Sequence, residues 1–175
     1  TFSRVMKEKG IEDAINAVES VNAHFGRTVY TLDIFGQVDV EYKERFSQLE
    51  KSFPDYISYG GAIEANKSVE TLKSYFALLF PTYYKGEGFA GTLIDAMSAG
   101  VPVIASDWKY NPEFVVPGKT GVIIKNCNAE RLAEELINIA AAPEKWNSMR
   151  LSALKESEKY KPDIAARPLI DRING

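Results

Sequence analysis

Two continuous apolar runs, Tyr75 to Phe80 and Val101 to Ala105, constrain the fold more than any other feature of this sequence. Each run has the length of a strand, and neither alternates with polar residues, so each is expected to be buried on both faces. A stretch with helical spacing, Leu93 to Met97, separates the runs and ends at Gly100. Strand, helix and strand in this order predict a parallel pair joined by a crossover helix.

The same alternation extends along the chain. It predicts a Rossmann-like open parallel α/β sheet with helices on both faces. The other expected strands are Thr28 to Phe35, Asp55 to Tyr59 and Val122 to Ile124, and the other expected helices are Ile11 to Phe25, Tyr42 to Phe53, Val69 to Ser74, one capped by Asn128 and one starting at Pro143.

The pattern places residues 1–160 in one domain and residues 161–175 in a helical tail, which Pro162 and Pro168 interrupt. The first residues, Thr1 to Arg4, resemble the end of a strand. We therefore expect the 175 residues to be a piece of a longer protein.

Composition excludes several classes of site. A net charge of -3 provides no broad basic field, so no nucleic-acid partner is expected. One cysteine, Cys127, cannot form an internal disulfide or a thiolate metal cage, and one histidine, His24, cannot build a His-rich site. We interpret His24 as a solvated residue near a helix end. The chain has neither a signal peptide nor an apolar run of ~18 residues, and we expect a cytoplasmic protein.

The stretch from Gly86 to Gly91 formally matches the G-x-G-x-x-G fingerprint of dinucleotide-binding proteins. Two features contradict that interpretation. Pro81 to Lys85 separate the first glycine from its strand, and Glu87 would place a carboxylate against the pyrophosphate. A nicotinamide or flavin cofactor is therefore not expected.

A helix that begins near Thr92 presents free N–H groups at the positive end of its dipole, and nearby glycines allow close approach of an anion. Glu87 lies between two glycines, too early to cap the helix, and is expected to face the same crevice and accept hydrogen bonds from hydroxyls. Asp95 has two interpretations. Thr92-x-x-Asp95 fits a capping box, or else Asp95 accepts hydrogen bonds from vicinal hydroxyls.

Arg4 and Lys9, with Lys7 nearby, lie in a loop that closes at Gly10 and should reach the same sheet edge. The loop is either a solvated basic segment or one side of a diphosphate clamp completed by the helix amides. No Asp-x-Asp element is present, so cationic side chains would take the place of a metal ion.

These blocks together resemble the C-terminal half of retaining GT-B glycosyltransferases, and more narrowly the family 4 group that builds capsular and other surface polysaccharides. The resemblance runs from Ser3 to about Tyr160 with the blocks in the family's order. It rests on Ser3-Arg4 with Lys9-Gly10, on Pro81 to Phe89, on Asp95 to Met97 with Gly100 to Asp107, and on Pro112-Glu113 with Gly118 to Gly121.

The resemblance implies transfer of a glycosyl unit from a nucleotide-diphospho-sugar with retained configuration, without metal or other cofactor. It implies that Arg4 and Lys9 contact the donor diphosphate and that Glu87 holds sugar hydroxyls, the three catalytic positions. The donor-binding positions implied are Gly88, Phe89, Ala90, Gly91, Thr92 and, at the ribose hydroxyls, Asp95. The acceptor, a sugar or polysaccharide intermediate, would bind an absent N-terminal half, so the isolated chain should have little or no turnover.

The parent enzyme would then associate peripherally with a membrane. Three departures from the family pattern are present: Asp95 replaces the usual Glu, Ala90 replaces a glycine, and Lys109-Tyr110-Asn111 stands where glycines are common.

Two other functions stay open, a GT-B-fold sugar-nucleotide epimerase and a non-catalytic nucleotide-sugar binding module. The epimerase would need a different set of acids and histidines.

Overall fold

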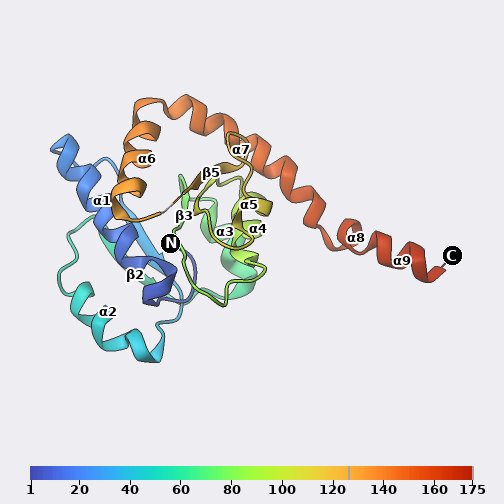
Figure 1. Cartoon of the computed structure of the whole chain (residues 1–175), viewed down its shortest axis with the longest axis horizontal. Helices are drawn as coiled ribbons and strands as arrows, with labels where there is room; N and C mark the ends of the chain where they lie inside the picture. The colour runs from blue at the N-terminus through green and yellow to red at the C-terminus, as the bar shows by residue number, and fades with distance from the viewer. Residues whose placement is uncertain (126, 175) are drawn as a thin grey trace.

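The computed structural model describes residues 1–125 and 127–174. Five strands alternate with helices in this part of the chain (Figure 1). The strands are β1 (Leu32–Phe35), β2 (Ile57–Gly61), β3 (Leu78–Phe80), β4 (Val103–Ser106) and β5 (Gly121–Ile124). The α-helices are α1 (Ile11–Phe25), α2 (Lys43–Glu50), α3 (Ser68–Leu72), α4 (Gly91–Ser98), α5 (Asn111–Phe114), α6 (Ala129–Ala141), α7 (Pro143–Ser157), α8 (Pro162–Ala165) and α9 (Arg167–Asn174). The 3-10 helices are η1 (Lys7–Lys9), η2 (Val40–Tyr42), η3 (Ala65–Lys67) and η4 (Glu158–Tyr160).

All strand pairs are parallel, and they form two groups. β1 pairs with β2, and β4 pairs with β3 on one side and β5 on the other. Between the groups, the segment Thr1 to Val5 runs parallel to β1 through bridges from Phe2 to Phe35 and from Val5 to Val38. The prediction of a parallel α/β sheet is confirmed, although β1, β3 and β4 are shorter than expected.

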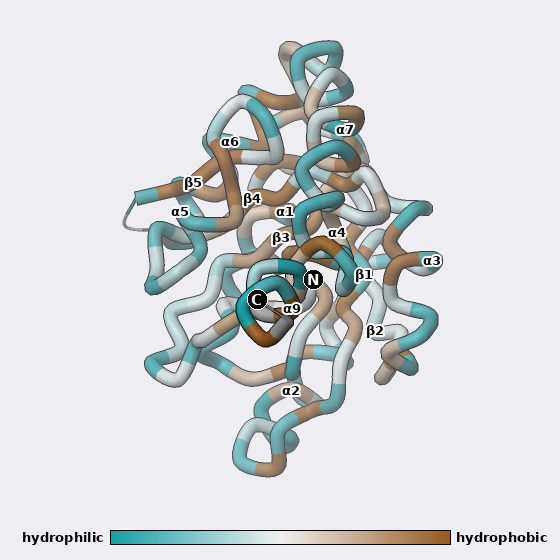
Figure 2. The backbone as a smooth tube through the Cα atoms, turned by 90° about the vertical axis from the view of Figure 1, so that its right-hand side faces the viewer, coloured by the Kyte–Doolittle hydropathy of each residue, from teal (hydrophilic) through white to brown (hydrophobic). Residues whose placement is uncertain are grey.

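Helices cover both faces of the strands. On one face α1 packs against α6, and Ile15, Val18 and Leu132 lie in the core between them and the sheet. On the other face α4 packs against α7 and α3, with Leu93 and Ala96 in a second apolar cluster. Figure 2 shows that the most apolar stretches lie in the middle of the molecule and that polar residues occupy the surrounding loops. This arrangement confirms the prediction of helices on both faces.

Several sequence signals mark element ends correctly. The side chain of Asn128 accepts the N–H of Arg131 and caps α6, and Pro143 occupies the first turn of α7. Gly100 follows α4 with φ of 66°, the left-handed conformation that glycine adopts at such ends. Beyond α7, α8 and α9 extend away from the rest of the chain (Figure 1).

Candidate functional site

The loops that follow β3 and β4 lie at the carboxyl ends of these strands, the edge where ligands bind in open α/β sheets. The loop that contains η1 is fixed to the same edge. The N–H of Tyr83 donates to the carbonyl of Glu8 at 2.8 Å, and Gly10 approaches Pro81 so closely that a Cβ would lie 2.3 Å from the Pro81 carbonyl oxygen. The two predicted halves of the site therefore meet.

Lys9 and Glu87 form the centre of this edge. Lys9 Nζ donates to Glu87 Oε1 at 2.8 Å and to Oε2 at 2.7 Å, and the two side chains are 12% and 7% exposed. The ammonium group also lies over the rings of Phe80 and Tyr84, at 5.6 and 5.2 Å from their centroids. The cation is thus held by a carboxylate and two aromatic faces, which fixes its position.

Hydrogen-bond capacity in this pair is not exhausted. An ammonium has three donors and a carboxylate about four acceptor positions. Lys9 uses two donors on Glu87, and Glu87 accepts these two bonds and one from the Thr82 hydroxyl at 2.7 Å. One donor and one acceptor position are left, enough for a phosphate oxygen at Lys9 and a hydroxyl at Glu87.

Behind Glu87 a buried polar network joins the two loops. The Ser106 hydroxyl donates to the Thr82 carbonyl, and the side-chain amide of Asn111 donates to the Ser106 carbonyl at 3.1 Å. The indole N–H of Trp108 donates to the Tyr84 carbonyl at 2.7 Å. Asn111, whose role the sequence left undefined, therefore holds Ser106, and Ser106 and Trp108 bond to the backbone of the loop that carries Glu87.

The entrance of α4 lies next to this network. Its N-cap residue, Ala90, offers no side-chain cap, and Phe89 beside it is 69% exposed and packs edge-on against Phe114. Gly88 and Gly91 are exposed, and a Cβ on either would meet no atom within 4 Å. The first amides of the helix are accordingly accessible to an anion.

The capping interpretation of Asp95 is wrong. The helix begins at Gly91, two residues earlier than the capping box requires, and the Thr92 hydroxyl donates to the Phe2 carbonyl at 2.8 Å. Asp95 Oδ2 accepts the Ser68 hydroxyl at 2.7 Å, at the start of α3. The carboxylate is thus directed toward the first residue of α3 and away from its own helix end.

Arg4 does not join the Lys9–Glu87 pair. Its side chain is 62% exposed, and its guanidinium lies 3.7 Å from Asp39 Oδ2, the long contact of a surface ion pair. Lys7 is also exposed. The sequence thus placed Lys9 and Glu87 at the same edge without predicting that they pair with each other, and it expected Arg4 to lie closer to them than it does.

Two contributors were missed. Thr82 and Ser68 carry no distinctive sequence pattern, and only the structure places their hydroxyls on Glu87 and Asp95. Tyr83 follows Thr82 in the same loop; burial, together with the carboxylates of Asp13, Glu8 and Glu12, raises the pKa of its phenol, which is therefore neutral at pH 7. In the described residues, 1–125 and 127–174, no three His, Cys, Asp or Glu side chains gather in a way that could hold a metal ion.

The fold and this edge define an open parallel α/β domain with a candidate ligand site at the carboxyl ends of its strands. The family model "Glycosyl transferases group 1" matches residues 1–156, and the chain belongs to this family. Relatives include the GtfA subunit of a UDP-N-acetylglucosamine–peptide N-acetylglucosaminyltransferase from Streptococcus gordonii, 33% identical over 71% of this chain and 23% of its own length. A GDP-mannose-dependent mannosyltransferase from Corynebacterium glutamicum is 27% identical over 81% of this chain and 37% of its length.

Solved structures have the same fold. A GtfA/B complex superposes with a TM-score of 0.80 at 24% identity over 99% of this chain and 35% of that one. HepE from Anabaena superposes with a TM-score of 0.82 at 16% identity over 99% of this chain and 47% of that one. These neighbours are GT-B glycosyltransferases. The chain spans less than half the length of these relatives.

Proposed function

We propose that this chain is the donor-binding part of a retaining, metal-independent glycosyltransferase that uses a nucleotide-diphospho-sugar, in polysaccharide biosynthesis. The observation that supports this most is the buried Lys9–Glu87 pair, which retains one donor and one acceptor beside the open entrance of α4. The domain comprises residues 1–160, with 161–175 as a tail. In the described chain no helix combines the length and apolarity needed to cross a bilayer, and we propose a cytoplasmic enzyme in peripheral contact with a membrane.

The proposed binding mode assigns one group to each part of the donor. The amides from Gly88 to Thr92, at the entrance of α4, and the third donor of Lys9 bind the diphosphate, and Arg4 is free to turn from Asp39 toward it. Glu87 accepts a hydroxyl of the sugar, and Asp95 accepts the ribose hydroxyls beside Ser68. Solved relatives are described in complex with UDP and GlcNAc and with UDP and glucose, which favours this class of ligand.

In the reaction, the bond between the anomeric carbon and the diphosphate breaks, and the diphosphate leaves with the electron pair. Preorganised positive charge is the usual stabilisation of such a leaving group, and Lys9 with the helix amides provides it. The oxygen of an acceptor hydroxyl then bonds to the anomeric carbon on the face that the diphosphate left, and the proton of that hydroxyl passes to the departing diphosphate oxygen. Residues outside these 175 would hold the acceptor, so the isolated chain should bind donor and transfer little sugar.

Calorimetric titration with UDP-, GDP- and ADP-sugars tests the proposal. We expect one of the three series to bind with a standard free energy of about −4 to −8 kcal/mol, which corresponds to a millimolar to micromolar Kd. We expect the bare nucleoside diphosphate to bind at the same site, because the diphosphate provides most of the charge. Absence of binding in all three series would refute the proposal.

Glu87→Gln is the variant that assigns the sugar in the same titration, with exposed Glu8→Gln as its matched control. The neutral amide of glutamine accepts a hydrogen bond from a sugar hydroxyl more weakly than the charged carboxylate does. Affinity for the sugar nucleotide should therefore fall about 10-fold, the equivalent of ~1.4 kcal/mol. Affinity for the bare nucleotide should change less. Equal effects on both ligands would remove Glu87 from the sugar subsite.

A further inference from the structure

The turn between β4 and α5 places Lys109 beside the proposed donor site. Among the described residues, Lys109 is the only one other than glycine with a positive φ, 49°. A lysine rarely adopts this left-handed conformation, because its Cβ comes too close to the following carbonyl oxygen. Such strain persists only where the surrounding structure enforces it, and it concentrates at active sites and ligand clamps. The strained backbone therefore marks this turn as a candidate for function.

Contacts on both sides hold the turn in this conformation. The N–H of Trp108 donates to the Ser106 carbonyl at 2.8 Å, and the N–H of Asn111 donates to the Trp108 carbonyl at 3.0 Å. The Asn111 side chain, 1% exposed, donates to the same Ser106 carbonyl. Lys109 thus lies between two fixed neighbours, and its strained conformation belongs to an ordered turn.

The turn is joined directly to the loop that carries Glu87. The Tyr84 carbonyl accepts the backbone N–H of Glu87 at 3.1 Å and the indole N–H of Trp108 at 2.7 Å. Lys9 Nζ lies 5.2 Å from the centroid of the Tyr84 ring. Lys109 Nζ lies 5.9 Å from the ring centroid of Trp108. Two bonded aromatic residues therefore connect the two lysines, and both cations belong to one edge of the sheet.

The Lys109 ammonium differs from that of Lys9 in its lack of a carboxylate partner. Within residues 1–125 and 127–174 no Asp or Glu forms an ion pair with Lys109, whose side chain is exposed. An ammonium has three donors and no acceptor, and its bonds to ionised acceptors are roughly twice as strong as bonds between neutral groups. A carboxylate or a phosphate therefore suits this cation better than a sugar hydroxyl, with which water competes.

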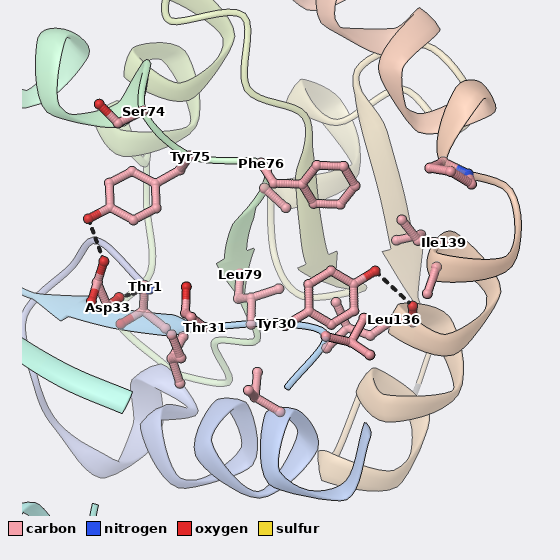
Figure 3. Close-up of a pocket in the computed structure, with 16 residues that line it drawn as sticks. Thr1, Tyr30, Thr31, Asp33, Ser74, Tyr75, Phe76, Leu79, Leu136 and Ile139 are labelled. Carbon is pink, nitrogen blue, oxygen red and sulfur yellow. Dashed lines mark hydrogen bonds between the residues drawn. The ribbon is translucent and has the colours of Figure 1, made fainter. Parts of the chain in front are cut away.

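The cavity at the opposite end of the strands offers no comparable cation. It has a volume of about 680 Å³ and lies between the amino ends of β1 and β3 (Figure 3). The described residues on its wall include neither lysine nor arginine. Its carboxylate, Asp33, accepts the hydroxyl of Tyr75 at 2.7 Å, a bond drawn in Figure 3. An anionic ligand is therefore expected at the turn of Lys109 and not in this cavity.

We propose that Lys109, held over Trp108, binds an anionic group of the saccharide next to Glu87, on either the donor sugar or the acceptor. The group is a carboxylate, as in a uronic acid, or a phosphate. This inference rests on the proposed function, because that function places a sugar at Glu87. The site then has two anion positions, one for the diphosphate at Lys9 and one for the charge of the substrate itself at Lys109.

Calorimetry with matched nucleotides tests the donor sugar as the source of the charge. The pairs are UDP-glucose with UDP-glucuronic acid, GDP-mannose with GDP-mannuronic acid, or ADP-glucose with ADP-glucuronic acid, according to the base that binds. The uronic acid should bind about 10-fold more tightly than the hexose. Lys109→Gln keeps the left-handed backbone, removes the charge and should abolish this preference, with little effect on the hexose. Lys119→Gln, an exposed lysine just before β5 at the amino ends of the strands, is the matched control and should preserve it.

Nuclear magnetic resonance of the chain saturated with the nucleoside diphosphate tests the acceptor as the source. The probes are methyl glucuronide and glycerol 3-phosphate, with methyl glucoside as the neutral control. The indole signal of Trp108 should shift with an anionic probe and not with the glucoside, and Lys109→Gln should remove the shift. The indole of Trp146, 1% exposed and bonded to Phe76, should not respond.

Lys109→Gly separates a binding role from a role in folding. Glycine adopts this conformation without strain, so Tm should rise by about 2–4 °C while the anion preference is lost. An unchanged or lower Tm would remove the strain from which the inference begins. If neutral nucleotide sugars bind but neither experiment shows an anion preference, or if the preference survives Lys109→Gln, this inference is overturned and the proposed function stands. Absence of all nucleotide binding would refute both.

Discussion

Replacing Lys9 by methionine is expected to lower both stability and nucleotide affinity. Methionine keeps an unbranched apolar stem against Phe80 and Tyr84, but the Glu87 carboxylate, 7% exposed, loses the charge that compensates its burial. Removing one partner of a buried ion pair typically costs about 3–5 kcal/mol. A Tm lower by roughly 10 °C should result, and calorimetry should show at least a 10-fold weaker Kd for the nucleoside diphosphate.

Lys85→Met is the matched control, because Lys85 is an exposed lysine in the same loop. It removes the same charge from the same edge and should change neither quantity appreciably. The double variant Lys9→Met with Glu87→Gln should recover part of the lost stability, since the buried charge is then gone, but should not recover diphosphate affinity. Equal effects of the two lysine variants would mean that general charge, and not the buried pair, determines binding.

Gly10→Ala is the second change with a large expected effect. Gly10 has φ of 71°, a conformation that costs a non-glycine residue about 1–2 kcal/mol. The added methyl group would also lie 2.3 Å from the carbonyl oxygen of Pro81, which is backbone and cannot move aside cheaply. We expect a total loss of about 3 kcal/mol or more in the free energy of unfolding, measured by urea denaturation.

Gly26→Ala separates the two causes. Gly26 has φ of 63°, but nothing lies within 4 Å of its added methyl group. Only the conformational cost of about 1–2 kcal/mol should therefore appear. If Gly10→Ala costs no more than Gly26→Ala, the close contact between the η1 loop and Pro81 is not part of the folded protein in solution.

The sequence predicted the elements that have strong local signals. Tyr75 to Phe80 and Val101 to Ala105 identified β3 and β4, and Asn128 identified the start of α6. Strand ends were less accurate: β3 begins only at Leu78, because the side chains of Phe76 and Trp146 pack against each other and the indole N–H of Trp146 donates to the Phe76 carbonyl before the ladder begins. Hydrophobicity alone cannot show where pairing stops.

The residues of the candidate site were likewise predictable only in part. Lys9 and Glu87 were predictable because parallel strand ends and the loops after them share one edge, and the structure joins the two residues. The sequence left two interpretations for Asp95, a cap on its own helix or an acceptor for ligand hydroxyls. Only the position of α3 shows that its carboxylate accepts the hydroxyl of Ser68. The separation of the strands into two groups likewise could not be predicted, because periodicity in the sequence does not show which strands pair.

The most direct test of the donor site is nuclear magnetic resonance of the native chain during titration with the nucleoside diphosphate that binds in calorimetry. Amide shifts are expected to change at Gly88 to Thr92 and in the η1 loop around Lys9, with the same saturation curve for both segments. The amides around Thr31 and Ala77, at the opposite end of the strands, should not respond. Changes confined to that end, or a response of only one of the two loops, would contradict a diphosphate held between them.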